Sequence, residues 1–280
     1  MSWPFLIPLI LQIGPWPGGS TVSALPQEMR DREALEQQKQ AAEASGQELN
    51  LRQQCLQLAR TSPVAGQQQA ESWLAIATGT QKAEAGHCLG FALSQQGQWS
   101  AAERAFSAAR IEADPMDRPY RARLAAMAGN AALADGDAAG ALILFNAAEA
   151  DARSGGDASQ LADIATDRAR ALVVAGRIDE ATQSLATARA TDPANARTWL
   201  LSATLSRRTE RLGDAQQQIE QAARLDPANP EVGLEAGVIA VLTGRDDAAR
   251  KSWQSVIAIA PDSAEASVAR DYIAQLDGAQ

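Results

Sequence analysis

The residues that could perform catalysis in this sequence are few, and they do not form a recognisable catalytic group. The 280 residues include one histidine, His87, and two cysteines, Cys55 and Cys88. Nucleophilic catalysis by serine or cysteine usually needs a histidine base. His87 adjoins Cys88, but adjacent residues of a helix point about 100° apart, so the two would not form a dyad. We expect His87 to be a packed or groove-lining residue, and we predict no catalytic residue and no enzyme.

Metal and phosphate chemistry are also poorly represented. Two cysteines cannot supply the four Cys or His ligands of a structural zinc site, and a single histidine also argues against a catalytic zinc. The sequence contains no G-x-x-x-x-G-K-[ST] loop and no G-x-G-x-x-G after a strand. Cys55 and Cys88 do not form a C-x-x-C motif, which argues against a redox function. We therefore predict no cofactor and no metal.

Composition points to a folded, helical, acidic protein. Lys and Arg number 25 against 34 Asp and Glu, which gives a net charge of −9 and disfavours nucleic acid or an anionic membrane surface as the main partner. With 46% apolar and 21% charged residues, the chain does not have the composition of a disordered protein. More than a fifth of the residues are alanine and only 4% are aromatic, which favours helices over an all-β fold.

The N-terminal segment has features of a targeting signal. Residues 3–13 are apolar but far shorter than the roughly 20 residues of a membrane-spanning helix. Val22-Ser23-Ala24 provides small residues in the manner of a signal peptidase site. We predict a signal peptide at 1–24, cleaved after Ala24, a polar extension at 25–45, and a periplasmic or secreted protein without stable membrane insertion. The absence of Lys and Arg before the apolar run keeps the alternative of a cytoplasmic protein open.

The rest of the chain contains a repeated pattern of two helices. Each repeat has an apolar helix, a turn at Gly97, Gly136, Gly176, Glu210 or Gly244, and a second helix. The second helix carries a small residue, a large apolar residue and another small residue at i, i+4 and i+7, which is one helix face. These triplets are Ala102-Phe106-Ala109, Ala141-Phe145-Ala148, Ala181-Leu185-Ala188, Ala215-Ile219-Ala222 and Ala249-Trp253-Val256. Ala70-Leu74-Ala77 repeats the pattern in an earlier, weaker hairpin.

The pattern resembles the tetratricopeptide repeat (TPR) family. Gly90, Gly129 and Gly237 match the family's small residue in the first helix, while Pro193, Pro227 and Pro261 match its closing proline. The resemblance implies an all-α, right-handed superhelical solenoid of antiparallel helix pairs. It places a degenerate hairpin at 46–82, repeats at 83–115, 122–153, 162–195, 196–229 and 230–261, and a capping helix at 262–278. The extra residues at 116–121 and 153–159 are expected to be longer loops or helix extensions.

The same resemblance implies a binding groove lined by the first helix of each repeat. The family's groove positions correspond to His87, Phe91, Arg123, Met127, Asn130, Asp163, Asp167, Arg170, Arg197, Arg207 and Arg208. The four arginines at 170, 197, 207 and 208 could bind a carboxylate or an acidic peptide. The alternative is that they are solvated or paired with Asp163 and Asp167.

The register also places Cys55 and Cys88 on neighbouring first helices. In an oxidising compartment they could form a disulfide that joins the weak first hairpin to the next one. Otherwise they are two small buried residues. We predict a non-catalytic scaffold or adaptor that binds a protein or peptide of unknown identity, with self-association into a homo-oligomer through the terminal hairpins as the alternative.

Overall fold

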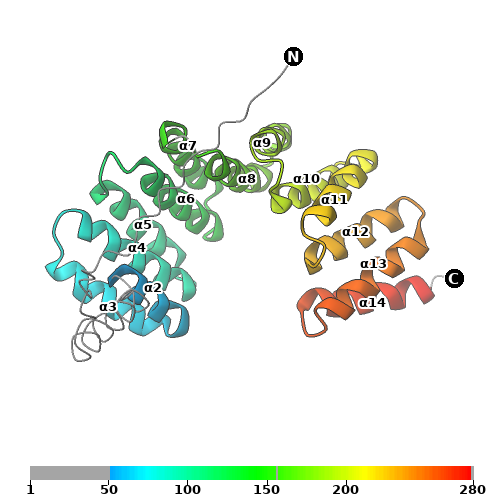
Figure 1. The fold of residues 1–280 in the computed structure, drawn as a ribbon, viewed down its shortest axis with the longest axis horizontal. Coiled ribbons are helices and arrows are strands. Elements are labelled where there is room, and N and C mark those ends of the chain that lie inside the picture. The colour runs from blue at the N-terminus through cyan, green and yellow to red at the C-terminus, as the bar shows by residue number, and fades with distance from the viewer. Residues whose placement is uncertain (1–50, 156, 279–280) are drawn as a thin grey trace, which may run out of the picture. The chain divides into compact units, whose positions relative to one another are not determined.

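The computed structural model describes residues 51–155 and 157–278, and the regular secondary structure of these residues is entirely helical (Figure 1). The thirteen helices are α2 (Leu51–Thr61), α3 (Pro63–Ile76), α4 (Thr80–Gln95), α5 (Trp99–Glu112), α6 (Arg118–Ala134), α7 (Ala138–Gly155), α8 (Ala158–Val174), α9 (Ile178–Thr191), α10 (Ala196–Arg208), α11 (Leu212–Leu225), α12 (Pro230–Leu242), α13 (Asp246–Ile259) and α14 (Ala264–Gly278). The expected all-α fold is confirmed. The predicted signal peptide and polar extension lie outside the described residues.

The helices form hairpins that pack in the order of the sequence. We call the first helix of each hairpin the A helix (α2, α4, α6, α8, α10, α12) and the second the B helix. Each helix packs against the next one along the chain, and from α6 onward each A helix also contacts the A helix of the next hairpin. Helix α14 continues this order by packing on α12 and α13. Each hairpin is thus stabilised by its neighbours, as in other repeat proteins.

From α6 onward, the starts of the A helices are fixed by side-chain caps. The carboxylates of Asp117 and Asp157 accept hydrogen bonds from the backbone N–H groups of Tyr120 (3.1 Å) and Gln160 (3.0 Å). Asn195 caps α10 in the same way through the N–H of Thr198 (3.1 Å). Short polar side chains at these positions satisfy donors that a helix start leaves unpaired.

From α4 onward, the turns between A and B helices depend on a residue with positive φ. Gly97, Gly136, Gly176 and Gly244 have φ between 69° and 89°, and Glu210 occupies the same place with φ 60°. In each turn the residue with positive φ donates its N–H to a carbonyl three residues earlier, for example Gly176 to Val173 (3.1 Å) and Glu210 to Arg207 (3.0 Å). Glycine adopts this conformation without steric cost, whereas glutamate does not.

The predicted triplets form the core. All fifteen residues of the five triplets are at most 3% exposed. In three repeats the large residue of the B helix lies directly on a glycine of the A helix: Phe106 on Gly90, Phe145 on Gly129 and Trp253 on Gly237. The other two repeats have Ala169 with Leu185 and Ala203 with Ile219 in shared clusters. A larger B-helix side chain is therefore accompanied by a smaller A-helix residue.

The first hairpin follows the pattern with one correction. Ala70 and Ala77 are buried as predicted, but Leu74 is only partly buried and Trp73 is the large residue that fills the space, with 7% exposure. Positions i+3 and i+4 share a helix face, so the larger indole can take the place of the leucine.

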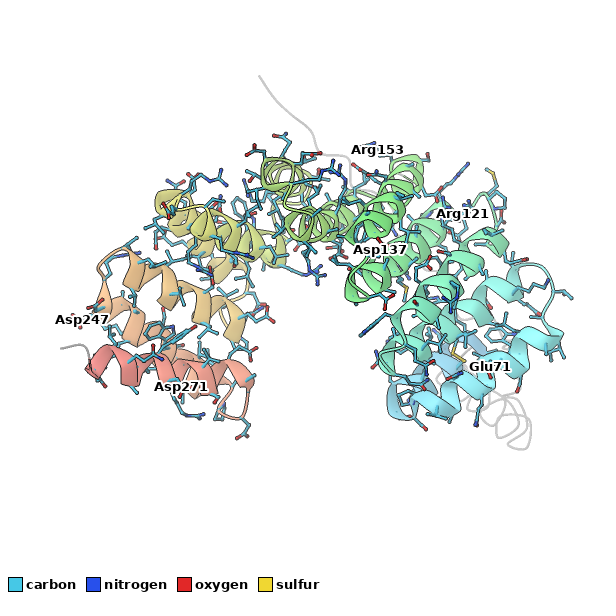
Figure 2. All side chains as sticks on the ribbon, turned by 180° about the vertical axis from the view of Figure 1, so that it is seen from behind. Glu71, Arg121, Asp137, Arg153, Asp247 and Asp271 are labelled. Carbon is cyan, nitrogen blue, oxygen red and sulfur yellow. A yellow bond between two sulfur atoms is a disulfide. The ribbon has the colours of Figure 1, made fainter. Side chains whose placement is uncertain are left out.

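The extra residues at 116–121 and 153–159 mostly lengthen helices rather than loops, because α6 begins at Arg118, α7 ends at Gly155 and α8 begins at Ala158. The longer α7 brings Asp151, which is 4% exposed, against three arginines. Its carboxylate contacts Arg110 (2.7 Å), Arg118 (3.1 Å) and Arg121 (3.8 Å), the last of which is labelled in Figure 2. This cluster ties α5, α6 and α7 together.

Candidate functional site

Two cavities lie along the A helices. One, of about 320 Å³, lies between α6 and α8, and its lining includes Arg123, Met127 and Asn130. The other, of about 730 Å³, extends over α8, α10, α12 and the start of α14, and its lining includes Arg170 and Arg197. We call this A-helix surface the A-helix groove. Of the predicted groove residues, these cavities bring together Arg123, Met127, Asn130, Asp163, Asp167, Arg170 and Arg197.

Asp167 organises the centre of the groove. Asp167 is 8% exposed, and its carboxylate accepts hydrogen bonds from Asn130 Nδ2 (2.7 Å) and Arg197 Nη2 (2.6 Å). Arg170 Nη1 lies 3.5 Å from the same carboxylate and 3.3 Å from Asn130 Oδ1. One buried carboxylate thus positions two exposed guanidinium groups, and this local cluster keeps one net positive charge.

Polar contacts also join α8 to α10. Asn195 Nδ2 donates to Asp163 Oδ1 (2.8 Å), and the buried hydroxyls of Thr166 and Thr198 are 2.8 Å apart. Arg170 and Arg197 therefore both pair with Asp167, as the alternative interpretation of the arginine patch anticipated, whereas Asp163 binds Asn195.

Arg207 and Arg208 differ in their roles although they are adjacent. Arg207 is partly buried and pairs with Glu235 of α12 through contacts of 2.6 Å and 3.3 Å, so it connects two repeats. Arg208 is exposed and forms no hydrogen bond or ion pair with any described residue. Of the two, only Arg208 has a guanidinium free to bind a ligand.

His87 and Phe91 lie at the N-terminal end of the groove but present little to solvent. His87 is 7% exposed, and its Nδ1 lies 3.3 Å from the hydroxyl of Tyr120. That hydroxyl donates to the carbonyl of Ala83 (3.3 Å), so it accepts from His87, which places the imidazole proton on Nδ1. Phe91 is partly buried and lies beneath the guanidinium of Arg60 at 5.8 Å. His87 is therefore a packed residue, which is one of the two roles expected for it.

The environment of His87 holds it in the neutral form. Burial, followed by the positive charges of Arg52 and Arg123, lowers the pKa of His87 to about 4. Burial also raises the pKa of Tyr120, so its hydroxyl stays protonated. The arrangement is a stable hydrogen-bonded pair rather than a nucleophile with its base.

Cys55 of α2 and Cys88 of α4 form a disulfide with a Cα–Cα distance of 6.0 Å, drawn in yellow in Figure 2. Both residues are fully buried, in a cluster with Ala59, Ala70 and Ala92. The bond joins the first A helix to the second.

The described residues contain no group of three or more His, Cys, Asp or Glu side chains arranged to hold a metal ion. Among the same residues, none of the helices has the length and apolar character needed to span a bilayer.

Seven of the eleven residues predicted for the groove line its two cavities, and the residues that position them were not predicted. Asn195, Thr198 and Glu235 lie 28 to 32 residues from the side chains that they bind. Leu201 and Thr204, which line a further cavity, were also missed. Leu201 follows Arg197 by four residues and Thr204 precedes Arg208 by four, and this helical spacing could have placed them on the same face.

Comparison with known proteins supports the repeat assignment. Residues 166–230 and 200–264 each match the tetratricopeptide repeat family model. A comparison with curated proteins finds no match.

Solved structures show the same fold. BtubC from P. vanneervenii is 15% identical with a TM-score of 0.59, and the match covers 73% of this chain and 90% of that one. PilF of Pseudomonas aeruginosa is 14% identical with a TM-score of 0.59, covering 79% and 97%. MamA (41-end) from Desulfovibrio magneticus RS-1 is 17% identical with a TM-score of 0.51, covering 65% and 98%. Together with the sequence repeats and the stacked hairpins, the family match shows that residues 166–264 of this chain are tetratricopeptide repeats, and the rest of the described helices continue the same fold.

Proposed function

We propose that this protein is a non-catalytic scaffold that binds a peptide segment of a protein partner in the A-helix groove. The observation that carries the proposal is the cluster around Asp167, which holds Arg170 and Arg197 in place beside open cavities. Guanidinium groups that are already positioned lose little conformational freedom when they bind a carboxylate. The same large cavity is also lined by Asp226, Glu231 and Glu265. The groove is thus suited to an extended segment that carries both acidic side chains, for the two arginines, and basic ones, for these carboxylates.

A photo-crosslinking experiment in cells tests this assignment. A photoreactive amino acid is placed at Arg123 or Arg197 in the groove, and at the matched control positions Gln183 and Gln217, which are exposed on B helices. Groove positions should give a discrete cross-linked partner whose attachment site maps to one segment. Equal cross-linking from the B-helix controls, or cross-linking from those alone, would overturn the proposal.

We place this activity in the cell envelope. The apolar N-terminal run and the small residues at 22–24 support export, and a Cys55–Cys88 disulfide is compatible with an oxidising compartment. The test is the intact mass of the protein expressed with its own N-terminus in a Gram-negative host and fractionated. Export predicts a periplasmic species that begins at Leu25 and is two hydrogens lighter than its reduced form. A full-length, reduced cytosolic species would exclude export.

Self-association is the second candidate function, and one observation favours it. An apolar cavity of about 380 Å³ lies at the C-terminal end, among Val238, Leu242, Trp253, Tyr272 and Leu276. Leu242 there is 52% exposed. A concentration-dependent mass in light scattering that becomes monomeric in Leu242→Glu would support a homo-oligomer built through this end. A monomeric wild type at high concentration would exclude it.

A further inference from the structure

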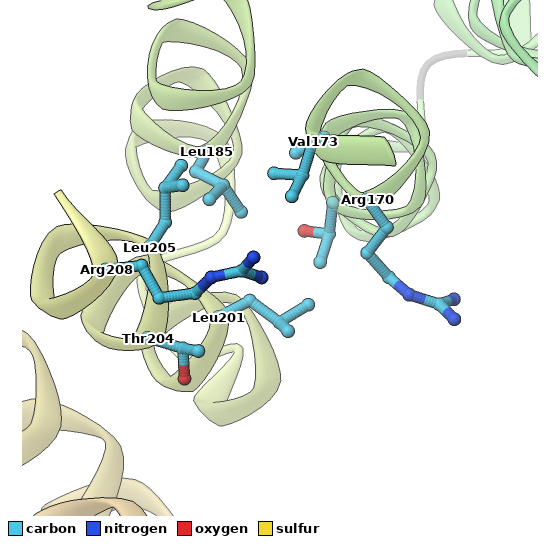
Figure 3. A pocket seen from close by; sticks show the side chains of 9 residues that line it. Arg170, Val173, Leu185, Leu201, Thr204, Leu205 and Arg208 are labelled. Carbon is cyan, nitrogen blue, oxygen red and sulfur yellow. The ribbon is translucent and has the colours of Figure 1, made fainter. Parts of the chain in front are cut away.

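A fourth cavity opens between α8, α9 and α10, and its walls are more apolar than those of the two cavities of the A-helix groove. It has a volume of about 150 Å³, and its walls include Ala169, Val173, Leu185, Leu201 and Leu205 (Figure 3). A dry cavity of about this size lined by aliphatic residues can hold a benzene molecule. The space therefore suits one leucine or phenylalanine side chain.

The cavity exists because two cores meet incompletely at this junction. Leu201 and Leu205 of α10 pack on the core of α6–α9, while Leu200 and Ala203 of the same helix belong to the core of α10–α12. Between α8 and α10 the contacts nearby are polar, such as the hydroxyl pair of Thr166 and Thr198. The B-helix residue here is Leu185, in a place where three other repeats have Phe or Trp, so less of the space is filled.

The charged residues at the cavity are cationic. Arg208 and Arg170 come from α10 and α8 and are among its lining residues (Figure 3), whereas no acidic residue among those described lines it. Arg208 is exposed and has no partner in the described chain, and Asp167, the nearest carboxylate to Arg170, already binds Asn130 and Arg197. An unneutralised guanidinium beside an apolar cavity is complementary to a ligand that carries both an apolar and an acidic group.

We infer that this cavity is a specificity pocket for the peptide partner, which receives one leucine or phenylalanine side chain while Arg208 binds an internal acidic residue next to it. The inference rests on the proposed function. It narrows the expected peptide partners to segments in which a leucine or phenylalanine lies next to an acidic residue. Arg170 lines the α8 side of the pocket, but its guanidinium pairs with Asp167 and points away from the pocket (Figure 3). Binding would bury the apolar side chain without a change of the backbone, because the space is already present.

Defined peptides and methyl NMR spectra test the inference. The probes are short peptides with blocked termini that carry Phe-Asp, and matched peptides that carry Phe-Lys or Ala-Asp, each titrated into the full chain. The Phe-Asp peptide should shift the methyl resonances of Val173, Leu185, Leu201 and Leu205, and should bind at least about tenfold more tightly than either matched peptide. No shift of these methyl groups at millimolar peptide would overturn the pocket.

Two pairs of variants separate the pocket from the groove. Val173→Phe fills the cavity, and its control Val174→Phe alters a neighbour that is 62% exposed and does not line it. Arg208→Glu reverses the charge at the pocket, and its control Arg104→Glu reverses an exposed charge on a B helix. Val173→Phe and Arg208→Glu should each weaken Phe-Asp binding about tenfold or more, with the controls unchanged.

The outcome also distinguishes the two proposals. If groove positions still cross-link a partner while the pocket variants bind Phe-Asp as the controls do, the pocket is wrong and the groove function stands. If groove cross-linking is absent as well, the proposed function itself fails. Preference of Arg208→Glu for the Phe-Lys peptide would identify Arg208 as the residue that selects the charge.

Discussion

The indole of Trp253 lies directly against the backbone of Gly237, with no space for a Cβ atom on residue 237. The indole Nε1 donates to the carbonyl of Leu234 (3.1 Å), so the ring cannot easily turn away. The equivalent repeat with Ala203 has Ile219, a smaller residue, in place of the indole. The repeats thus pair either glycine with a large B-helix side chain or alanine with a smaller one. One pairing should replace the other without loss of stability only when both residues are changed together.

Gly237→Ala should lower the free energy of unfolding by about 1–3 kcal/mol, because the added methyl group overpacks the core. In a Trp253→Ile background the same substitution should cost little, which gives a coupling energy of about 0.5–3 kcal/mol in a double-mutant cycle. Urea unfolding monitored by circular dichroism measures all four proteins. Gly213→Ala is the control, because its Cβ would meet no atom within 4 Å and should not destabilise the helix. Additive costs would contradict the proposed packing relationship.

Glu210 adopts a left-handed backbone conformation, which has a steric energy cost for glutamate that the glycines of the other turns do not have. Its φ of 60° and its hydrogen bond to Arg207 match those of the glycine turns. Glu210→Gly should therefore stabilise the protein by about 1 kcal/mol, because relief of the steric cost exceeds the added entropy of the unfolded chain. The reciprocal Gly176→Glu should destabilise it by a similar amount. A lower unfolding midpoint for Glu210→Gly would show that the glutamate side chain contributes more than its backbone costs.

The fold could be predicted because each repeat encodes it locally. Triplets such as Ala102-Phe106-Ala109 specify a buried helix face by spacing alone, and the turn glycines specify where one helix ends. Each hairpin then buries these faces against its neighbours, so the same local signals fix the stack. The one register error, Leu74 for Trp73, arose where two adjacent residues could serve the same face.

The site could be predicted only in part, because its chemistry depends on contacts between repeats. The sequence placed Arg170, Arg197 and Arg207 on A helices, but not their partners. Arg207 binds Glu235 across 28 residues, and Asp167 binds Arg197 across 30. Such pairs depend on side-chain rotamers and on the offset between successive hairpins, and neither has a periodic signature in the sequence. The pocket beside Arg208 arises from the same offset.

Asp151 should be important for the stability of the folded protein, although it does not line the A-helix groove. Its buried carboxylate accepts from Arg110 and Arg118, and lies near Arg121. Asp151→Asn should cost roughly 3–5 kcal/mol, because it leaves three guanidinium groups close together without compensation. Thermal and urea unfolding measure the loss. The exposed pair of Arg177 and Glu180 provides the control, since Glu180→Gln should change neither midpoint. Equal effects of the two substitutions would refute this role.

The disulfide should stabilise mainly the first hairpin. Helix α2 buries only Cys55 and Ala59, and among the described residues the first hairpin has a neighbouring hairpin on one side only. The bond joins residues with a sequence separation of 33. By lowering the entropy of the unfolded chain, a crosslink of this length should raise the free energy of unfolding by about 4 kcal/mol. Reduction, or Cys55→Ala with Cys88→Ala, should speed amide exchange in α2 and α3 while α10–α13 stay protected. Uniform loss of protection would instead indicate that the bond stabilises the whole stack.

His87 should make the protein less stable in mild acid. Its pKa is about 4 in the folded chain, lowered by burial and by the charges of Arg52 and Arg123, against 6.5 for an ordinary histidine. Between pH 6.5 and 4 the unfolded chain binds a proton that the folded chain does not, so the free energy of unfolding falls as the pH falls. The loss approaches about 1.4 kcal/mol per pH unit, or about 2 kcal/mol between pH 7 and 5.

The comparison with His87→Gln isolates this contribution, because both proteins share the same carboxylates. From pH 7 to 5 the wild type should lose about 2 kcal/mol more than the variant. His87 is the only histidine, so its imidazole resonances in an untagged protein can be followed by NMR without assignment. They should stay in the neutral, Nδ1-protonated form down to about pH 5. An imidazole that titrates near 6.5, with parallel stability curves for both proteins, would show that His87 is solvated rather than bound to Tyr120 in the core.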